Sequence, residues 1–315
     1  MIKFILKRIS YMVITLWIII TITFFLMNTL PGSPIESGAK RLPEQVRINM
    51  MHKWGLDLPV YRRYVLYLRN LMKGNLGESI ITPGLSATSI IHDKFPASAR
   101  LGLQAVFFGL IVGLILGILA AFKRDSWVDY LVMVVAIIGV SVPSFVIASL
   151  LQKFLGGKYF PIVGWPSYNV WFSGFKYTVL PTIALSLGNV AIFARYMRAS
   201  VLDVLGQDYV LTAEAKGISN INIVFKHIIR NSIIPIITIL GPQIAGILTG
   251  SFVIERIFSI PGLGQYFVES ITGRDYTMIM ANTIFYSFLF IVSLLVVDIL
   301  YVIVDPRIKV AGSSK

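Results

Sequence analysis

Six uncharged apolar runs constrain this chain more than any other feature of its sequence. Each is about as long as the roughly 20 residues that a helix needs to cross a bilayer at about 1.5 Å per residue. The runs are Ile9–Leu30, Leu101–Phe122, Tyr130–Gln152, Tyr177–Ala194, Asn231–Ile254 and Tyr276–Val297. The pattern predicts an all-α membrane protein with six transmembrane helices, the fourth reaching residue 197 and the sixth residue 304.

Composition excludes a water-soluble globule. Hydrophobic residues make up 56% of the 315 residues and charged residues only 14%, whereas soluble domains carry about 25% charged residues. The formal net charge is +13, but the basic residues stand at the flanks of the apolar runs instead of in one dense arm. We therefore expect membrane lipid, and not nucleic acid, to be the partner of these charges.

The first run follows Lys3, Lys7 and Arg8 and could be a cleaved secretory signal. Its apolar core is longer than the usual 7 to about 15 residues of a signal peptide. The residues after it, Leu30-Pro31-Gly32, also lack a small-x-small cleavage pattern. We interpret the run as a retained first helix.

The distribution of basic residues predicts the orientation. An N-terminus in the cytoplasm puts most Lys and Arg residues that flank helices on the inner side. These are Lys3, Lys7, Arg8, Lys123, Arg124, Arg195, Arg198, Lys216, Lys226, Arg230, Arg307, Lys309 and Lys315. The 70-residue segment from 31 to 100 carries ten Lys and Arg residues and would lie outside, but the rule weakens for segments longer than about 60 residues. We expect a multi-pass membrane protein with both termini cytoplasmic.

The six apolar runs predict one transmembrane domain, residues 1–309. It would contain an extracellular segment at 31–100 and a cytoplasmic loop at 199–230, and a polar tail at 310–315 would follow. The helical spacing of apolar residues in Glu44–Met72 predicts short amphipathic helices on the outer face. There is no cysteine, so disulfides and thiol chemistry are excluded.

Small residues and prolines recur within the apolar runs. Glycines four residues apart let helix backbones approach closely, as at Gly109, Gly113 and Gly117 and at Gly246 and Gly250. Prolines remove a backbone donor and favour kinks, and they occur at Pro143, Pro181, Pro235 and Pro242. Kinked helices suit a pathway that opens and closes, but inert bundles also contain them.

Ionisable residues give little support to catalysis. Asp298 lies deep in the last apolar run, where it is either a paired structural charge or part of a proton relay. We expect no second buried carboxylate or histidine to accompany it. His52, His92 and His227 are scattered, without metal-ligand spacing, and no Gly-x4-Gly-Lys-Ser/Thr loop is present to bind phosphates.

The polar loop between the fourth and fifth runs is the strongest candidate site. In Asp208–Gly217 helix formers end at a glycine suited to a helix C-cap, which predicts one short helix followed by a turn. We expect Ala213, Ala215 and Gly217 to make one face small enough for a partner surface to come close. Any connecting loop can be helical and contain alanine, so the pattern alone does not decide between docking and simple connection.

This loop resembles the coupling loop of ABC importer permeases, Glu-Ala-Ala-x3-Gly. Leu211, Thr212 and Ala213 stand where the general signature has Glu-Ala-Ala, so the glutamate is absent from its usual place and Glu214 falls at a variable position. Gly217 to Pro235 is five residues longer than the general spacing. The run Thr-Ala-x-Ala-Lys-Gly is similar to the dipeptide, oligopeptide and nickel branch of these permeases.

Further matches to this branch cover almost the whole chain. They are Leu30-Pro31-Gly32-Ser33-Pro34, Gly55-Leu56-Asp57-Leu58-Pro59, Gly74-Asn75-Leu76-Gly77-Glu78-Ser79, Ser141-Val142-Pro143-Ser144-Phe145, Ile254-Glu255, Pro261-Gly262-Leu263-Gly264, Arg274-Asp275-Tyr276 and Asp305-Pro306-Arg307. The resemblance implies the type I ABC importer permease fold and a location in the plasma membrane of a prokaryote.

The resemblance also implies a function: import of oligopeptides, driven by ATP and coupled through this loop. The expected partners are a second homologous permease, two ATP-binding subunits that hold ATP and Mg, an extracellular substrate-binding protein and the peptide. The chain itself would be no enzyme and would hold no cofactor or metal. The coupling residues would be Asp208, Leu211, Thr212, Ala213, Glu214, Ala215, Lys216 and Gly217.

Alternatives remain at this stage. Nickel or dipeptide import would leave the architecture unchanged, because selectivity rests largely with the binding protein. A proton-coupled carrier would need titratable groups along a path, for which Asp298 alone is a poor candidate. A membrane enzyme would need a catalytic cluster, which the sequence does not show.

Overall fold

The structure is a computed structural model that describes residues 2–29, 44–53, 55–82, 84–166, 171–250 and 252–304. Throughout these ranges the regular elements are helices, and the β structure is limited to two isolated bridges, Glu78 with Ser86 and Gly156 with Phe160. The motifs at 30–34 and 305–307 and the tail at 310–315 lie outside the described residues.

The chain folds into two compact units. The first takes Met1–Ser98 and Pro261–Ile291, and the second takes Ala99–Ile260 and Val292–Lys315. Two long helices, α5 (Ala87–Phe122) and α15 (Tyr276–Val304), contribute residues to both units. Each unit therefore combines segments that are far apart in the sequence.

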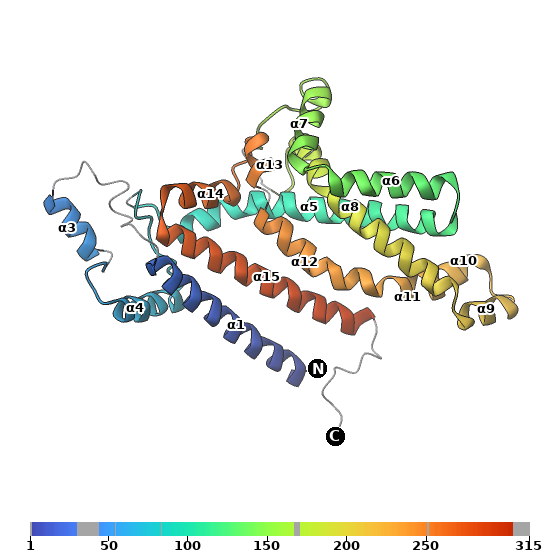
Figure 1. Ribbon diagram of the computed structural model, residues 1–315, viewed down its shortest axis with the longest axis horizontal. Helices are drawn as coiled ribbons and strands as arrows, with labels where there is room; N and C mark the ends of the chain where they lie inside the picture. The colour runs from blue at the N-terminus through green and yellow to red at the C-terminus, as the bar shows by residue number, and fades with distance from the viewer. Residues whose placement is uncertain are drawn as a thin grey trace. The chain divides into compact units, whose positions relative to one another are not determined.

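The first unit holds the N-terminal helices and one late helix. They are α1 (Ile2–Thr29), α3 (Glu44–Lys53), α4 (Val60–Met72) and α14 (Leu263–Gly273), together with the first parts of α5 and α15 (Figure 1). The prediction of short helices within Glu44–Met72 is confirmed by α3 and α4. α4 packs on α1 because the Tyr64 hydroxyl is hydrogen-bonded to Thr21 Oγ1 at 2.6 Å and the rings of Tyr64 and Tyr67 contact Phe24.

A buried polar clasp, Ser79 with Asp275, fixes the loop between α4 and α5 to the start of α15. The Ser79 hydroxyl donates to Oδ2 of Asp275, and the backbone N–H groups of Ile80 and Met278 donate to its Oδ1, each at 3.3 Å. Gly77 approaches Thr277 so closely, at φ +99°, that an added Cβ would lie 2.5 Å from Thr277 Cγ2. Two of the segments matched in the sequence, Gly74–Ser79 and Arg274–Tyr276, are thus bonded to each other.

The second unit is built around the long helix α8 (Phe175–Leu205), against which α6, α7 and α12 pack. Its other elements, some visible in Figure 1, are α6 (Trp127–Ser141), α7 (Ser144–Leu155), α9 (Asp208–Ala215), α10 (Asn220–Asn222), the π-helix η1 (Ile223–Ile229), α11 (Arg230–Ser232), α12 (Ile234–Gly250) and α13 (Phe252–Ile257).

By length and composition, four helices in the described ranges could cross a membrane: α1, α5, α8 and α15. Two bent pairs raise the number to six if each pair is one crossing. The run Tyr130–Gln152 is not one straight helix, because Pro143 lacks the N–H that would continue α6 and the chain turns by 106° into α7. A second bend, of 49°, separates residues 220–232 from 234–244 beside Pro235.

The helix α5 begins at Ala87, whereas the apolar run begins at Leu101. The added turns are amphipathic. Ile90 and Ile91 are buried against Leu263 and Met278, while His92 and Asp93 are exposed. Hydropathy detects only the uniformly apolar part of such a helix. The amphipathic start of α5 therefore falls within the predicted extracellular segment 31–100.

Three glycines of α5 let it touch α8 backbone to backbone. An added Cβ at Gly109, Gly113 or Gly117 would lie 2.6 or 2.7 Å from an atom of α8. At Gly117 two of these atoms are the carbonyl oxygen of Ala194, at 2.6 Å, and Cβ of Met197, at 2.7 Å. The predicted close packing is confirmed here, but an added Cβ at Gly246 meets no heavy atom within 4 Å. For Gly250 the side-chain surroundings are not among those described.

The expectation that no carboxylate other than Asp298 is buried is wrong. Asp129, Glu255 and Asp275 are all buried, whereas Asp298 is only half-buried. Each of the three lies near a helix end, where hydropathy alone places a residue at the interface with water. Hydrogen-bond partners in the folded chain decide whether such a carboxylate is buried, as the bond between Ser79 and Asp275 shows.

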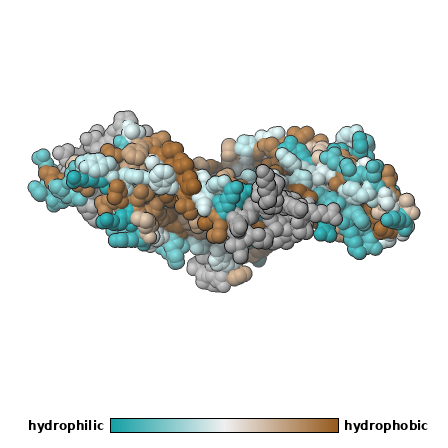
Figure 2. All heavy atoms as spheres, turned by 90° about the horizontal axis from the view of Figure 1, so that it is seen from below, coloured by the Kyte–Doolittle hydropathy of each residue, from teal (hydrophilic) through white to brown (hydrophobic). Residues whose placement is uncertain are grey.

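Large apolar side chains are exposed along the helices that could cross a membrane. Trp17 of α1 and Ile111 of α5 are examples, and apolar residues cover broad areas of the surface (Figure 2). Monomeric soluble proteins rarely show large contiguous apolar patches. This surface is therefore suited to lipid or to other membrane helices.

We predict that Gly117→Ala destabilises the isolated chain in detergent, because the new methyl group collides with the α8 backbone. The expected loss is about 1–3 kcal/mol, the usual range for overpacking. Gly246→Ala is the control, since its methyl group meets no neighbour and alanine favours the helix. Apparent unfolding temperatures measure both variants; equal temperatures for the two would contradict the α5–α8 contact.

Candidate functional site

The predicted short helix in the polar loop is present as α9, which follows α8 after Gly206 and Gln207. Its first residue, Asp208, places a negative charge at the positive end of the helix dipole. The Thr212 hydroxyl donates to the Asp208 carbonyl one turn back along the helix, at 2.8 Å. The helix thus has a defined start directly after α8.

The end of α9 is fixed by Gly217 at φ +69°. The Gly217 N–H donates to the Glu214 carbonyl at 2.9 Å, and the Ile218 N–H donates to the Ala213 carbonyl at 3.2 Å. This pair of bonds is the Schellman motif, in which the residue after the cap takes a left-handed conformation. Glycine is required for its backbone angles and not for space, because an added Cβ would meet no atom within 4 Å.

The two faces of α9 differ in burial. Val210 and Ala213 are 1% and 4% exposed, three residues apart on the inner face. Asp208, Leu211, Thr212 and Ala215 are exposed and follow the i, i+3, i+4, i+7 spacing of the opposite face. The prediction that Ala213 shares an open, small face with Ala215 and Gly217 is wrong, because residues two apart on a helix point in nearly opposite directions.

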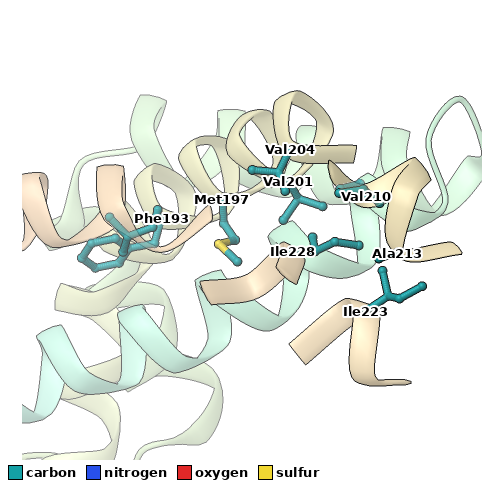
Figure 3. Packing of buried hydrophobic residues seen from close by; sticks show 10 residues of the cluster. Phe193, Met197, Val201, Val204, Val210, Ala213, Ile223 and Ile228 are labelled. Carbon is teal, nitrogen blue, oxygen red and sulfur yellow. The ribbon is translucent and has the colours of Figure 1, made fainter. Parts of the chain in front are cut away.

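An apolar cluster anchors the inner face of α9. Val210 and Ala213 point toward side chains of α8 and of the following helix, Val201, Val204, Ile223 and Ile228 (Figure 3). The cluster continues along α8 to Met197 and Phe193. A displacement of α9 is therefore passed to α8 through side chains that are in direct contact.

A polar contact ties α9 to the helix that leads onward. The Asn231 amide donates to the Tyr209 hydroxyl at 3.2 Å and to the His227 carbonyl at 2.7 Å. Between α10 and α11 the chain forms the π-helix η1, whose Ile223 and Ile228 are buried in the same cluster. π-Helical turns are rare and occur frequently at functional sites.

An ion pair beneath this region was not foreseen from the sequence. Arg198 of α8 donates from Nε and Nη2 to the two carboxylate oxygens of Asp129, both at 2.6 Å, and Asp129 is 3% exposed. The Asp125 N–H donates to the same carboxylate at 3.2 Å, which fixes the turn between α5 and α6. Two-point pairing restricts the orientation of both groups. The signal available in the sequence was a carboxylate at the edge of the third run, on the same side of the predicted membrane as Arg198.

No group of three or more His, Cys, Asp or Glu side chains that could hold a metal occurs in the described ranges. The site consists of a short helix with an anchored inner face and an exposed outer face. Such an arrangement can bind another protein and pass on its movement. Leu211 on the outer face is 59% exposed, and Ile221 of α10 and Phe225 of η1 are also exposed.

The chain belongs to the family of binding-protein-dependent transport system inner membrane components, which matches residues 113–310. The N-terminal family of the same transport membrane components matches residues 1–101. Members of this family are membrane permeases of ABC transporters.

Similar proteins are peptide permeases by name. The chain is 44% identical to the dipeptide transport system permease protein of Bacillus subtilis, over 98% of each chain. It is 42% identical to that of Lactococcus lactis and 39% identical to the oligopeptide transport system permease protein of Escherichia coli K12, each over 98% of this chain and 100% of the relative. A crystal structure of an amino acid ABC transporter shares the fold at a TM-score of 0.51 and 17% identity, covering 68% of this chain and 93% of the other.

We predict that Ala213→Asp destabilises the chain by roughly 3 kcal/mol, because it places an unpaired charge in the apolar cluster. The matched control is Ala215→Asp, the same substitution on the exposed face of the same helix. Yield and apparent unfolding temperature in detergent distinguish the two. Tolerance of both substitutions would show that α9 is not anchored through Ala213.

Proposed function

We propose that this chain is a membrane-spanning permease subunit of an ATP-driven importer that carries peptides into the cytoplasm. The observation that carries the proposal is similarity along nearly the whole chain to permeases named for dipeptide and oligopeptide transport. The chain itself would not hydrolyse ATP. Partner subunits would hold ATP and Mg.

The proposed topology has six crossings, with each bent pair counted as one. Both termini then lie in the cytoplasm, and α3 and α4 lie outside. The Lys and Arg residues near α9 support this orientation, because short cytoplasmic loops are enriched in them. α9 would therefore face the ATPase subunits.

The proposed coupling element is the loop Asp208–Gly217, with α9 docked on an ATPase subunit. Its exposed stripe carries Leu211, a large apolar side chain that contact with a partner would cover. Its buried side joins α8 through Val210 and Ala213, so displacement of α9 would move a long helix of the second unit. ATP can drive alternating access only if its binding energy differs between the inward-open and outward-open states.

The proposed assembly contains this chain, a second homologous permease, two ATPases and an extracellular substrate-binding protein. The two permeases would line the pathway together.

The proposal predicts peptide uptake that depends on both the gene and ATP. Labelled dialanine and tetraalanine would be supplied to cells with and without the gene, before and after ATP depletion, and labelled nickel would serve as a third substrate. Uptake of either peptide, lost without the gene or without ATP, is the expected result. Gene-dependent nickel uptake alone would reject the peptide assignment, and uptake that persists without ATP would reject the coupling mechanism.

We predict that Gly217→Val impairs uptake about tenfold or more, because a β-branched residue at φ +69° carries strain of roughly 1–3 kcal/mol and distorts the end of α9. Gly217→Asn is the control, since asparagine tolerates this conformation. Uptake and ATP hydrolysis by the assembled complex would be measured together. Normal uptake with Gly217→Val in a correctly assembled complex would remove the loop from the coupling mechanism.

A further inference from the structure

A cavity of about 310 Å³ lies within the first unit, in a part of the chain that the proposed coupling does not use. Its wall is formed by the end of α1, one face of α4, the loop before α5 and the first turns of α15. Both α1 and α15 are long and apolar enough to cross a membrane. The cavity therefore lies where two such helices have their ends, at the depth of a membrane interface.

Two residues on one face of α4, Arg63 and Tyr67, line this cavity and carry hydrogen-bond donors. Arg63, Leu66, Tyr67 and Asn70 line it and follow the i, i+3, i+4, i+7 spacing of one helix face. The Tyr67 hydroxyl is buried without a hydrogen-bond partner in the described part of the chain. The Arg63 guanidinium is half-buried and forms no ion pair there.

The protonation states of these groups suit an anion. Burial raises the pKa of the Tyr67 phenol, so the hydroxyl stays protonated and can donate. Burial also lowers the pKa of Arg63 from a value so high that the guanidinium remains charged near neutral pH. A buried donor without a partner costs free energy until an acceptor arrives, and so does a half-buried guanidinium that has no ion pair.

The remaining wall favours a ligand with an apolar body. Phe24, Met27 and Met280 line the cavity together with Leu66. Outside it, α1 exposes Ile22 and Leu26, and α4 exposes Tyr61 and Val65. Glu78 also lines the cavity, so both signs of charge are present, which suits a zwitterion better than a simple anion.

We propose that this cavity binds the headgroup of a membrane phospholipid, with its phosphate between Arg63 and the Tyr67 hydroxyl. The phosphate supplies acceptors to both donors, since guanidinium groups pair with phosphate through two parallel bonds. The acyl chains follow the apolar flanks of α1 and α4. The site requires the membrane location of the chain but not its peptide substrate.

The test uses the purified full-length chain in detergent and native mass spectrometry. The probe is dioleoylphosphatidylethanolamine, and dioleoylglycerol is the matched ligand without phosphate. Arg63→Gln is expected to weaken binding of the phospholipid about tenfold and to leave dioleoylglycerol binding unchanged. Arg62→Gln is the control variant, because Arg62 is exposed and does not line the cavity.

Tyr67→Phe separates binding from folding. It removes only the buried hydroxyl, so the unfolding temperature without added lipid should stay equal or rise while phospholipid affinity falls. Equal phospholipid affinity in wild type, Arg63→Gln and Tyr67→Phe would overturn the proposal. So would binding of glycerol 3-phosphate or trialanine as tight as that of the phospholipid and equally sensitive to Arg63→Gln, because the site would then hold a soluble ligand.

Discussion

The contact between α5 and α8 is the constraint on which the second unit depends. In lipid there is no hydrophobic drive to pair helices, so close packing must supply the attraction, and only residues without side chains allow it at this distance. Gly109, Gly113 and Gly117 provide such a seam. When α8 is packed there, Val201 and Val204 near its C-terminal end contact the inner face of α9. The candidate site is thus positioned by contacts that lie from one to several turns away from it along α8.

Charge reinforces the same seam. Arg198 of α8 lies beside Gly117: a Cβ added to Gly117 would lie 3.1 Å from the backbone nitrogen of Arg198. The Arg198 guanidinium is bonded to Asp129 of α6. A buried pair of this kind adds little net stability, but removal of one partner leaves a costly unpaired charge. The pair therefore fixes which way α6 and α8 face each other. α9 is thus packed firmly on one side and exposes side chains on the other.

The sequence was enough to predict the structure where one physical effect dominated. Hydropathy located the long helices, glycine spacing located the α5 seam, and a helix-ending glycine located α9 and its turn. It failed where tertiary contacts decide. Whether Ala213 is buried depends on the rotation of α9 against α8, and the burial of Asp129 and Asp275 depends on partners 69 and 196 residues away. Nor could composition locate the bend at Pro143, since Pro181 lies within a continuous helix.

The clasp between Ser79 and Asp275 has a consequence for how the chain is made. Its two halves are separated by most of the polypeptide, and the first unit includes nothing between Ser98 and Pro261. During synthesis the residues of the second unit up to Ile260 emerge before Asp275 exists, so they can pack while the N-terminal segment still lacks its partner. The loop that closes at the end is long, which makes this step slow relative to local helix pairing. The part of the protein that is made first thus remains without its partner until most of the chain has been synthesised.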